Sequence, residues 1–519
     1  MKLVNLSEDG RSLLLRIYDA DFEAALEFVR TELTGARFDP VRKMWTVPDT
    51  HNNEQRLMAD KWRFVGEAYC EIATKVELKP RKLLDVPPTY DYTQDGLRSY
   101  QNDAVWALKE RHDRAVLSMP PGTGKTLMGM TWLRTLKDPR VLIVCPAFLK
   151  THWQRSLMTW IGMHSISVKG RTPYKLPREL KCLVINYDIL YDWGRLLKGS
   201  FDTIVCDESH YLINEDAKRT QAVRYLADVP NLLFMTGTPI RSKTYQFLPV
   251  LRMIHNEPFR HKDYFLHKFC GPHFVRNKGL MFDGISNEEE LFHLLKHYMV
   301  RKTKEDVLPF LPRKNRVVYE VTADTSEMDA LAEGMDDLSQ LERERREAAI
   351  SRTGYFLKRQ FIKELVEELY EAVRKVVVVA FHHDVIDDLK ASFPDASVID
   401  GRVSPSKRQG LVDAFQKAEE AIIILQTQAG GVGFELDTSH DMVMAELVWV
   451  HGDIEQIEDR IHRMNTEADQ VNYFYPLVVD TIEEAMYDRI QKNSGNASKV
   501  LDGIDKKHFD GATKQRVDP

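Results

Sequence analysis

The sequence is poor in cysteine and has no long apolar run. Its five cysteines, at positions 70, 145, 182, 206 and 270, stand singly and never at the C-x-x-C spacing. This pattern argues against a disulfide framework and against a zinc site, and it favours a reducing compartment. No stretch approaches the roughly 18 consecutive apolar residues of a membrane-spanning helix. The N-terminus turns acidic at Glu8 and Asp9, before the apolar core of a signal peptide could form. We therefore expect an intracellular, cytoplasmic protein without a membrane segment.

The sequence also lacks a strong charge of one sign. Lys and Arg number 72 against 78 Asp and Glu, which leaves a formal net charge of −6 over 519 residues. This balance neither indicates nor excludes nucleic-acid binding, because phosphate-binding surfaces are local. The chain shows no internal repeat and no low-complexity tract. Its length predicts about three domains, and its 29% charged and 43% hydrophobic residues are typical of an ordinary folded protein.

The order of apolar runs, turns and charged stretches divides the chain into six segments. They are a small α+β module at 1–76, a proline-rich linker at 77–96, a first α/β lobe at 97–321, a charged helical connector at 322–374, a second α/β lobe at 375–490 and a polar, frayed tail at 491–519. In both lobes, β-branched runs alternate with helical stretches. This alternation is typical of parallel sheets with helices on both faces, so we predict two α/β lobes joined by a helical segment.

The strongest motif is a glycine-rich loop at 119–126, with the sequence Met-Pro-Pro-Gly-Thr-Gly-Lys-Thr. It follows an apolar strand at 115–118 and precedes a helix at 127–136, which is the context that a phosphate-binding P-loop requires. Met119 stands where the strict pattern has its first glycine. The alternative is a glycine-rich turn that merely precedes a helix.

Each residue of a P-loop has a distinct expected role. The residues whose backbone would surround the phosphate oxygens are Gly122, Thr123 and Gly124. Lys125 would reach the β- and γ-phosphates, and the Thr126 hydroxyl would bind Mg²⁺. These roles predict ATP and Mg²⁺ as cofactors.

An acidic pair lies about 80 residues further along the chain. Asp207 and Glu208 follow the apolar strand at 203–206. Asp207 can hold Mg²⁺ through water, and Glu208 can polarise the water that attacks the γ-phosphate. Alone, such a pair is more typical of a solvated loop. Together with the P-loop, it predicts a half of the molecule that binds and hydrolyses a nucleoside triphosphate.

Two arginines give the second lobe a role in this reaction. Arg460 and Arg463 lie three residues apart on a predicted helix and share one face. Such arginines can enter the site on the first lobe and stabilise charge on the transferred phosphoryl group. Hydrolysis would then require closure of the two lobes, which couples chemistry to motion. The alternative is a pair of surface arginines on an amphipathic helix.

The order of these motifs resembles that of superfamily 2 helicases, and specifically of the Swi/Snf-type translocases on double-stranded DNA. The stretches that carry the resemblance are 97–101 (Q motif), 119–126 (motif I), 144–150 (Ia), 207–210 (II), 236–239 (III), 428–433 (V) and 456–463 (VI). The resemblance implies two RecA-like P-loop lobes with helical insertions. It also implies that Gln101 recognises adenine and that Gly433 contributes to the nucleotide site.

Within this family, several stretches are similar to annealing helicases that remodel stalled replication forks. These stretches are 283–287, 299–308, 311–314, 380–383, 400–402 and 445–449. Residues 37–45 resemble the HARP module that such enzymes place before the motor. Trp45 with Arg37, Arg42 and Lys43 could form a stacking and phosphate-binding patch for single strands. The alternative is that Trp45 fills the core of the module.

The resemblance places DNA-backbone contacts on loops of both lobes, where they would carry no sequence information. The candidates are Lys150, Thr238, His382, His383, Arg402 and Gln428. Each of them could equally be an ordinary loop residue. A metal site at His382 and His383 is not expected, because adjacent residues at a strand end point in opposite directions.

The sequence thus predicts a DNA-dependent ATPase that tracks on duplex DNA and remodels or re-anneals branched DNA. The alternatives are a strand-separating DNA or RNA helicase, an ATP-driven remover of proteins from nucleic acid, and a DNA-binding protein with an inactive motor. Expected partners are double-stranded or branched DNA and a single-strand DNA-binding or replication protein. The sequence shows no chromatin-reading module. We expect a monomer of bacterial or viral type.

Overall fold

The computed structural model describes residues 96–517 apart from gaps at 112, 256–258, 260, 276–278, 309, 333–339, 428–434 and 464. Before residue 96 it describes 2–6, 12–17, 22–39, 44–48, 53, 56–57 and 63–64. Apart from Gly96, the predicted linker at 77–96 lies outside the described residues. The chain forms two compact units, one from 1–82 with 243–291 and the other from 83–242 with 292–519. None of the described helices is long and apolar enough to cross a membrane.

The N-terminal region forms the α+β module that the sequence predicts. Its sheet has the order β3 (Arg37–Asp39), β4 (Met44–Pro48), β2 (Ser12–Ile17), β1 (Lys2–Leu6) and β5 (Arg63–Phe64), and its helix is α1 (Phe22–Glu32). Leu13, Leu15 and Val29 are almost fully buried between the sheet and α1. Half-buried Trp45 packs against this core, which supports the core-filling alternative for this residue. Arg42 and Lys43 of the proposed single-strand patch lie outside the described residues.

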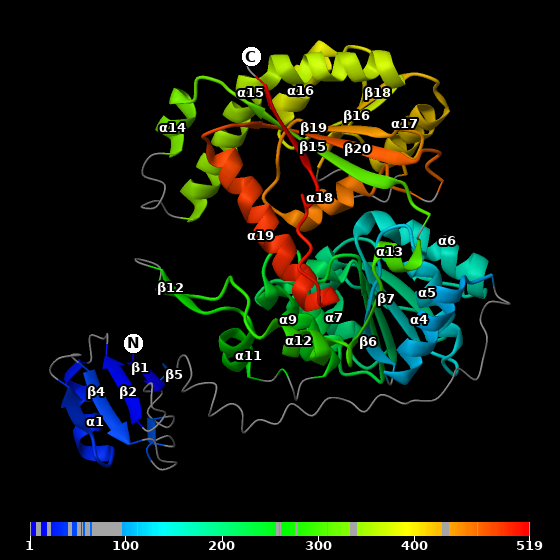
Figure 1. Ribbon diagram of the computed structural model, residues 1–519. Helices are drawn as coiled ribbons and strands as arrows, with labels where there is room; N and C mark the ends of the chain where they lie inside the picture. The colour runs from blue at the N-terminus through cyan, green and yellow to red at the C-terminus, as the bar shows by residue number, and fades with distance from the viewer. Residues whose placement is uncertain are drawn as a thin grey trace. The chain divides into compact units, whose positions relative to one another are not determined.

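The first lobe is built on a seven-stranded sheet, of which Figure 1 labels β6 and β7. The strand order is β14 (Met299–Arg301), β6 (Arg114–Ser118), β11 (Asn231–Thr236), β10 (Thr203–Asp207), β7 (Val141–Cys145), β9 (Cys182–Asn186) and β8 (Ile166–Ser167), and every pair is parallel. Its helices include α4 (Ser99–Glu110), α5 (Lys125–Arg134), α6 (Lys150–Ile161), α7 (Tyr187–Leu197) and α8 (Lys218–Leu226). The central strands are buried along their whole length, as continuous apolar runs predict.

The second lobe is built on a second fully parallel seven-stranded sheet. The strand order is β17 (Ser397–Ile399), β18 (Ala421–Gln426), β16 (Lys375–Ala380), β19 (Asp441–Met444), β20 (Gln470–Val478), β15 (Arg313–Val321) and β21 (Thr513–Val517). Its helices include α15 (Gln340–Val373), α16 (His383–Ser392), α17 (Pro405–Lys417), α18 (His451–Glu458) and α19 (Ile482–Asp502). The predicted fold class of two P-loop α/β lobes with an α+β module is confirmed.

The structure corrects the predicted end of the first lobe at residue 321. Strand β15 pairs with β20 along its whole length, from Arg313 opposite Gln470 to Val321 opposite Val478. It therefore belongs to the second sheet, and the first sheet ends with β14. In the sequence, the apolar run at 317–321 resembles one more strand of the first series. Its true partner lies about 157 residues further along the chain, so no local signal reveals the pairing.

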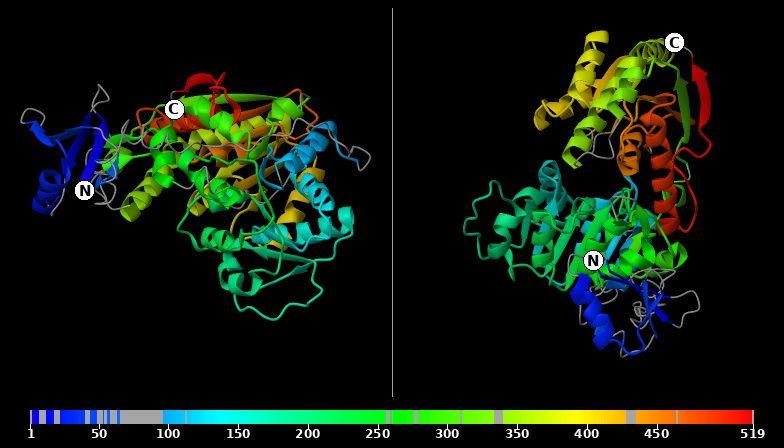
Figure 2. Two further views of the ribbon diagram at one scale, coloured as in Figure 1. Left: turned by 90° about the horizontal axis from the view of Figure 1, so that it is seen from below. Right: turned by 90° about the vertical axis from the view of Figure 1, so that its left-hand side faces the viewer.

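The segments predicted as a connector at 322–374 and as a frayed tail at 491–519 also belong to the second lobe. In α15, Tyr355, Ile362 and Val366 are almost fully buried in the core beside β16. Helix α19 continues past residue 490 to Asp502, and β21 adds an edge strand beside β15 (Figure 2, right, in red). The polar composition of β21 misled the prediction, because four of its five residues are exposed, as is usual at the edge of a sheet.

Candidate nucleotide site between the two lobes

The register of the first sheet brings three loops to one edge. Strands β6, β11 and β10 are parallel neighbours, with Ser118 opposite Thr236 and Met235 opposite Asp207. The P-loop follows β6, the acidic pair lies at the end of β10, and residues 236–238 lie at the end of β11. Because the carboxyl ends of parallel strands meet at one edge, motifs separated by more than a hundred residues share one site.

Two glycines and a lysine shape the P-loop. Gly122 and Gly124 have φ angles of 78° and 80°, in the left-handed region that favours glycine. The Lys125 ammonium donates hydrogen bonds to the carbonyl oxygens of Met119 at 3.0 Å and Pro120 at 3.2 Å. Burial lowers the pKa of Lys125, and the charges of Glu208 and Asp207 partly offset this effect.

Gln101 lies against this loop. Its amide nitrogen donates to the Thr123 carbonyl at 2.9 Å, and its amide oxygen accepts from the Arg98 backbone N–H at 2.9 Å. A Cβ on Gly124 would lie 2.5 Å from the Gln101 amide nitrogen, so the fit leaves no room for a side chain there. Gln101 thus connects α4 to the P-loop, while its contact with adenine stays a prediction. Thr126 is the second residue of α5, directly after Lys125.

The two acids are held in different ways. One Asp207 carboxylate oxygen accepts from the Trp153 indole N–H at 2.9 Å, and the other accepts from the Glu208 backbone N–H at 2.9 Å. Glu208 has a positive φ of 52°, an uncommon conformation for a residue other than glycine. Such strained residues cluster at functional sites. The His210 imidazole nitrogen lies 3.2 Å from the Glu208 carboxylate.

These surroundings separate the pKa values of the two carboxyls. Burial, and then the charge of Glu208, raise the pKa of Asp207 to about 6. Burial also raises the pKa of Glu208, but His210, Lys125 and Arg460 more than offset this effect and leave it at about 2. Glu208 is therefore ionised at neutral pH. A cation bound beside Asp207 would favour its ionised form and lower its pKa.

Both arginines of the second lobe reach this site. A Cβ on Gly122 would lie 2.6 Å from an Arg463 guanidinium nitrogen, so Arg463 lies directly on the P-loop. The charge of Arg460 lowers the pKa of Glu208. Burial, and then the charge of Arg463, lower the pKa of Arg460 to about 10. Both side chains are buried, at 6% and 8% exposure, which excludes the alternative of surface arginines.

Two contacts join the lobes beside this site. The Gln456 side-chain amide on α18 donates to the Thr238 hydroxyl at 3.3 Å. Arg241 forms an ion pair with Asp453, also on α18. Thr238, a predicted DNA contact, is buried at 6% exposure and thus lies in the seam between the lobes.

Four other candidate DNA contacts have partners within the described part of the chain. Lys150 donates to the Val168 carbonyl at 2.8 Å, and a His382 ring nitrogen lies 2.6 Å from the Glu446 carboxylate. Arg402 forms ion pairs with Asp387 and Asp400, and His383 lies 3.6 Å from Asp400. Gln428 and Gly433 lie outside the described residues. The roles of all these residues stay predictions.

A buried network that the sequence did not predict supports the two arginines. Its centre is Glu458, whose carboxylate accepts from Arg316 at 2.6 Å and Lys314 at 2.9 Å. Asp459, directly before Arg460, accepts from Lys304 at 2.6 Å. The signal was present as basic residues at 302–316 and an acidic pair within motif VI, but only the folded chain shows that they meet.

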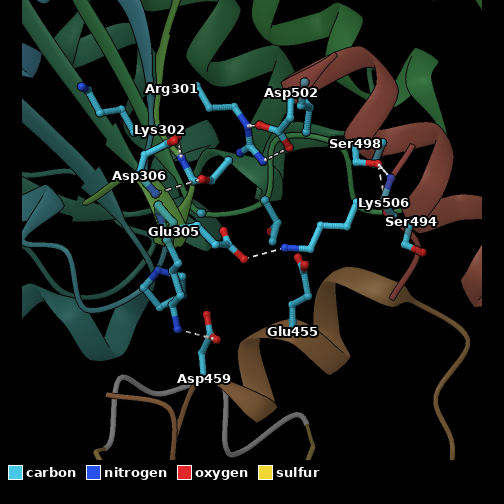
Figure 3. A pocket seen from close by; sticks show the side chains of 18 of the residues that line it. Arg301, Lys302, Glu305, Asp306, Glu455, Asp459, Ser494, Ser498, Asp502 and Lys506 are labelled. Atoms are coloured by element: carbon cyan, nitrogen blue, oxygen red, sulfur yellow. Dashed lines mark hydrogen bonds and ion pairs between the residues drawn. The ribbon is translucent and has the colours of Figure 1, made fainter. Parts of the chain in front are cut away.

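A cavity of about 1320 Å³ lies beside this network, at the seam of the lobes. Pro121 and Thr238 line it from the first lobe. Figure 3 shows Glu455 and Asp459 pointing into it from α18 and the turn after it, below Lys506 of the C-terminal segment. The Arg301 guanidinium holds the end of α19 through Asp502, at 2.7 and 2.9 Å.

Two family models match the chain. One is described as the SNF2-related domain and matches residues 100–368, and the other is described as the helicase conserved C-terminal domain and matches residues 358–465. Together they span the P-loop, both acids and both arginines.

Relatives are similar over most of this chain. A Caenorhabditis elegans protein, "SWI/SNF-related matrix-associated actin-dependent regulator of chromatin subfamily A-like protein 1 homolog", is 27% identical, with 91% of this chain and 72% of that protein covered. The Homo sapiens "DNA annealing helicase and endonuclease ZRANB3" is 25% identical, with 80% of this chain and 41% of that protein covered. The Xenopus tropicalis "SWI/SNF-related matrix-associated actin-dependent regulator of chromatin subfamily A-like protein 1" is 26% identical, with 83% of this chain and 51% of that protein covered. The chain thus spans about half or less of the length of the last two relatives.

A solved structure also matches, titled "Sulfolobus solfataricus SWI2/SNF2 ATPase core in complex with dsDNA". It is 19% identical, covers 76% of this chain and 90% of that chain, and has a TM-score of 0.38.

Proposed function

Because the chain belongs to the SNF2-related family, we propose that it is an ATP-driven motor that tracks on duplex DNA and remodels or re-anneals branched, fork-like DNA. Relatives whose names describe annealing helicases support the second part of this proposal. Double-stranded or branched DNA is the proposed partner, with a single-strand DNA-binding or replication protein as a further partner. The motor acts as a monomer in this proposal.

One observation carries the proposal: residues of both lobes build a single nucleotide site. Arg463 of the second lobe lies on Gly122 of the P-loop, and Arg460 acts on Glu208 electrostatically. A site that needs both lobes is complete only when they are closed. Binding and hydrolysis of ATP therefore alternate with closure and opening, which is how a two-lobed enzyme converts chemistry into movement.

The residues around the P-loop suit ATP and Mg²⁺. A side chain at Gly122 or Gly124 would collide with Arg463 or Gln101, so both positions of the loop require glycine. The Lys125 hydrogen bonds to two backbone carbonyls can be exchanged for stronger, charge-assisted bonds to phosphate oxygens. Thr126 and Asp207 offer the oxygen ligands that Mg²⁺ prefers. When bound, Mg²⁺ would neutralise charge on the phosphates.

The remaining charged groups have complementary tasks. Glu208 is ionised and orients the attacking water as a base, while His210 holds its carboxylate. Arg460 and Arg463 stabilise the charge that develops on the phosphoryl oxygens, a contribution of about 10³–10⁵ in rate in related phosphoryl-transfer enzymes.

DNA contacts would lie on loops outside this site. The described candidates with partly or fully exposed side chains are Lys150, His382, His383 and Arg402. Their present partners are acids, an amide and backbone carbonyls, which DNA phosphates can replace. Contacts of this kind read shape and charge rather than sequence.

The test is the ATPase rate of the full chain with no nucleic acid, single-stranded DNA, blunt duplex, forked DNA or structured RNA. We expect the strongest stimulation by forked or duplex DNA. Lys125→Ala should abolish hydrolysis on every substrate. Lys137→Ala, which removes an exposed lysine of the same lobe, should hydrolyse ATP normally.

Other outcomes favour other functions. Greater stimulation by RNA or single strands would indicate a strand-separating helicase. No stimulation by any nucleic acid would indicate a motor that acts on a bound protein. A strand-annealing assay on forked oligonucleotides separates re-annealing from unwinding, and ATP-dependent translocation by Lys125→Ala would contradict the motor itself.

A further inference from the structure

Two buried histidines meet between α18 and the C-terminal segment, and the proposed motor does not use them. His451 begins α18, and His508 follows α19. Their ring centroids lie 5.3 Å apart, with the rings nearly perpendicular. The two residues are only 7% and 5% exposed. The packing therefore brings together two imidazoles that are 57 positions apart in the chain.

A ring nitrogen of each histidine lacks a hydrogen bond within the part of the chain that the structure describes. These atoms are Nδ1 of His451 and Nε2 of His508. His508 Nε2 lies 3.2 Å from the Glu458 carboxylate, but not in hydrogen-bond geometry. A buried polar atom without a partner costs about 1–3 kcal/mol, and a ligand that bound either atom would remove that cost.

A carboxylate completes the cluster. Glu455 lies four residues after His451 on the same face of α18, with its Oε1 atom 3.3 Å from His451 Nε2. One donor atom from each of His451, Glu455 and His508 lies within 4.8 Å of the other two. Glu455 also faces the cavity at the seam of the lobes, which provides a path for entry (Figure 3).

We propose that His451, Glu455 and His508 bind one Zn²⁺ ion. Two imidazoles and a carboxylate are a common ligand set for zinc, which takes four ligands in a tetrahedral arrangement. A water from the cavity would supply the fourth ligand. The absence of paired cysteines, which argues against a zinc site at the sequence level, does not bear on a site of this composition.

The charges around the cluster leave room for a cation. Lys304, Lys314 and Arg316 lie nearby, but Glu458 and Asp459 accept hydrogen bonds from all three. With Glu455, the acids and bases of this region balance one another. Zinc would then fasten the C-terminal segment to α18, the helix whose Asp453 and Gln456 contact the first lobe.

The test is the zinc content of the untagged full chain. The protein is stripped with a chelator, incubated with ZnCl₂, desalted and analysed by mass spectrometry of the metal. We expect an equimolar amount of zinc in the wild-type chain and in His164→Gln, which changes an exposed histidine of the first lobe. His451→Gln and His508→Gln should retain only background zinc.

A second variant protects the test against loss of folding. Glu455 is partly exposed, so Glu455→Gln should keep the native circular dichroism spectrum while its zinc affinity falls. With Co²⁺ as the probe, the wild-type chain should give the visible absorption of a tetrahedral site, and Glu455→Gln should change it. Wild-type protein without equimolar zinc, or undiminished zinc in the folded variants, would overturn the proposal.

Discussion

Two acidic pairs, Asp207–Glu208 and Glu458–Asp459, look alike in the sequence and differ in the folded protein. Each pair ends a regular element, β10 in the first lobe and α18 in the second. Each lies within a motif that the sequence associates with ATP hydrolysis. Their surroundings nevertheless differ, because only the first pair contains a carboxyl, that of Asp207, whose pKa is raised.

In the first pair, cations compensate Glu208, whose pKa is lowered to about 2, but not Asp207. Asp207 accepts hydrogen bonds from an indole and a backbone N–H, and burial raises its pKa to about 6. The second pair is saturated. Lys304, Lys314 and Arg316 contact its carboxylates. Burial raises the pKa of Glu458, but the Arg316 and Lys314 charges more than offset this and hold it well below the usual range. An acidic pair with one uncompensated carboxyl is suited to binding a cation during catalysis. A pair whose carboxylates already accept hydrogen bonds from cationic side chains is suited to holding its neighbours in place.

The largest expected effect is on chemistry. Glu208→Gln keeps the shape of the side chain but removes the base, so the DNA-stimulated ATPase rate should fall about 10²–10⁴-fold. The free energy of unfolding in urea should also fall, because the lowered pKa of Glu208 means that its ionised carboxylate stabilises the folded state. A variant with normal hydrolysis would show that Glu208 is not the base.

The second prediction concerns the stability contributed by Glu458. Glu458→Gln leaves Arg316 and Lys314 buried beside a neutral amide, so the free energy of unfolding should fall by about 3–5 kcal/mol. Urea unfolding of the full chain measures this loss. Lys514→Gln, which removes an exposed ion pair with Glu320, is the matched control and should change stability by less than about 1 kcal/mol. A loss at Glu458 as small as in this control would contradict the saturated network.

The pH dependence of stability should also differ between the pairs. The pKa of Asp207 in the folded state, about 6, lies above its ordinary value of about 3.9, so stability falls as pH rises between these values. Asp207→Asn removes this cost. It should raise the free energy of unfolding by about 1–3 kcal/mol at pH 7.5, and the gain should vanish near pH 4.

Glu458→Gln serves as the contrast in the same urea titrations. The pKa of Glu458 is lowered, so its stabilisation is present above the ordinary pKa and is lost only at still lower pH. Its deficit should therefore be similar at pH 5 and pH 7.5. Equal pH profiles for the Asp207 and Glu458 variants would remove the distinction between the two pairs.

The smallest expected effect is the loss of one tyrosine hydrogen bond beside each pair. The Tyr475 hydroxyl donates to the Glu458 carboxylate at 2.7 Å, and the Tyr187 hydroxyl donates to the Asp207 backbone carbonyl at 2.8 Å. Because hydrogen bonds to charged groups contribute more, Tyr475→Phe should cost about 1.5–3 kcal/mol and Tyr187→Phe about 0.5–1.5 kcal/mol. Urea unfolding of both variants tests the order, and the reverse order would contradict a charged acceptor at Glu458.

The sequence by itself determined the parts that depend on local pattern. The P-loop could be recognised because an apolar strand, two glycines and a lysine at the start of a helix follow one another in the chain. The parallel sheets could be recognised because strands buried on both faces are continuous apolar runs. The N-terminal module and the two α/β lobes follow from the same kind of local signal.

Only the tertiary structure decided what depends on contacts between distant segments. It placed β15 beside β20 and β21 beside β15, pairings that no local pattern encodes. It also brought Arg463 to Gly122 and Arg316 to Glu458. Burial and charges from other elements set the pKa of a carboxyl, so identical residue types in similar motifs became a poised acid in one lobe and a structural anchor in the other.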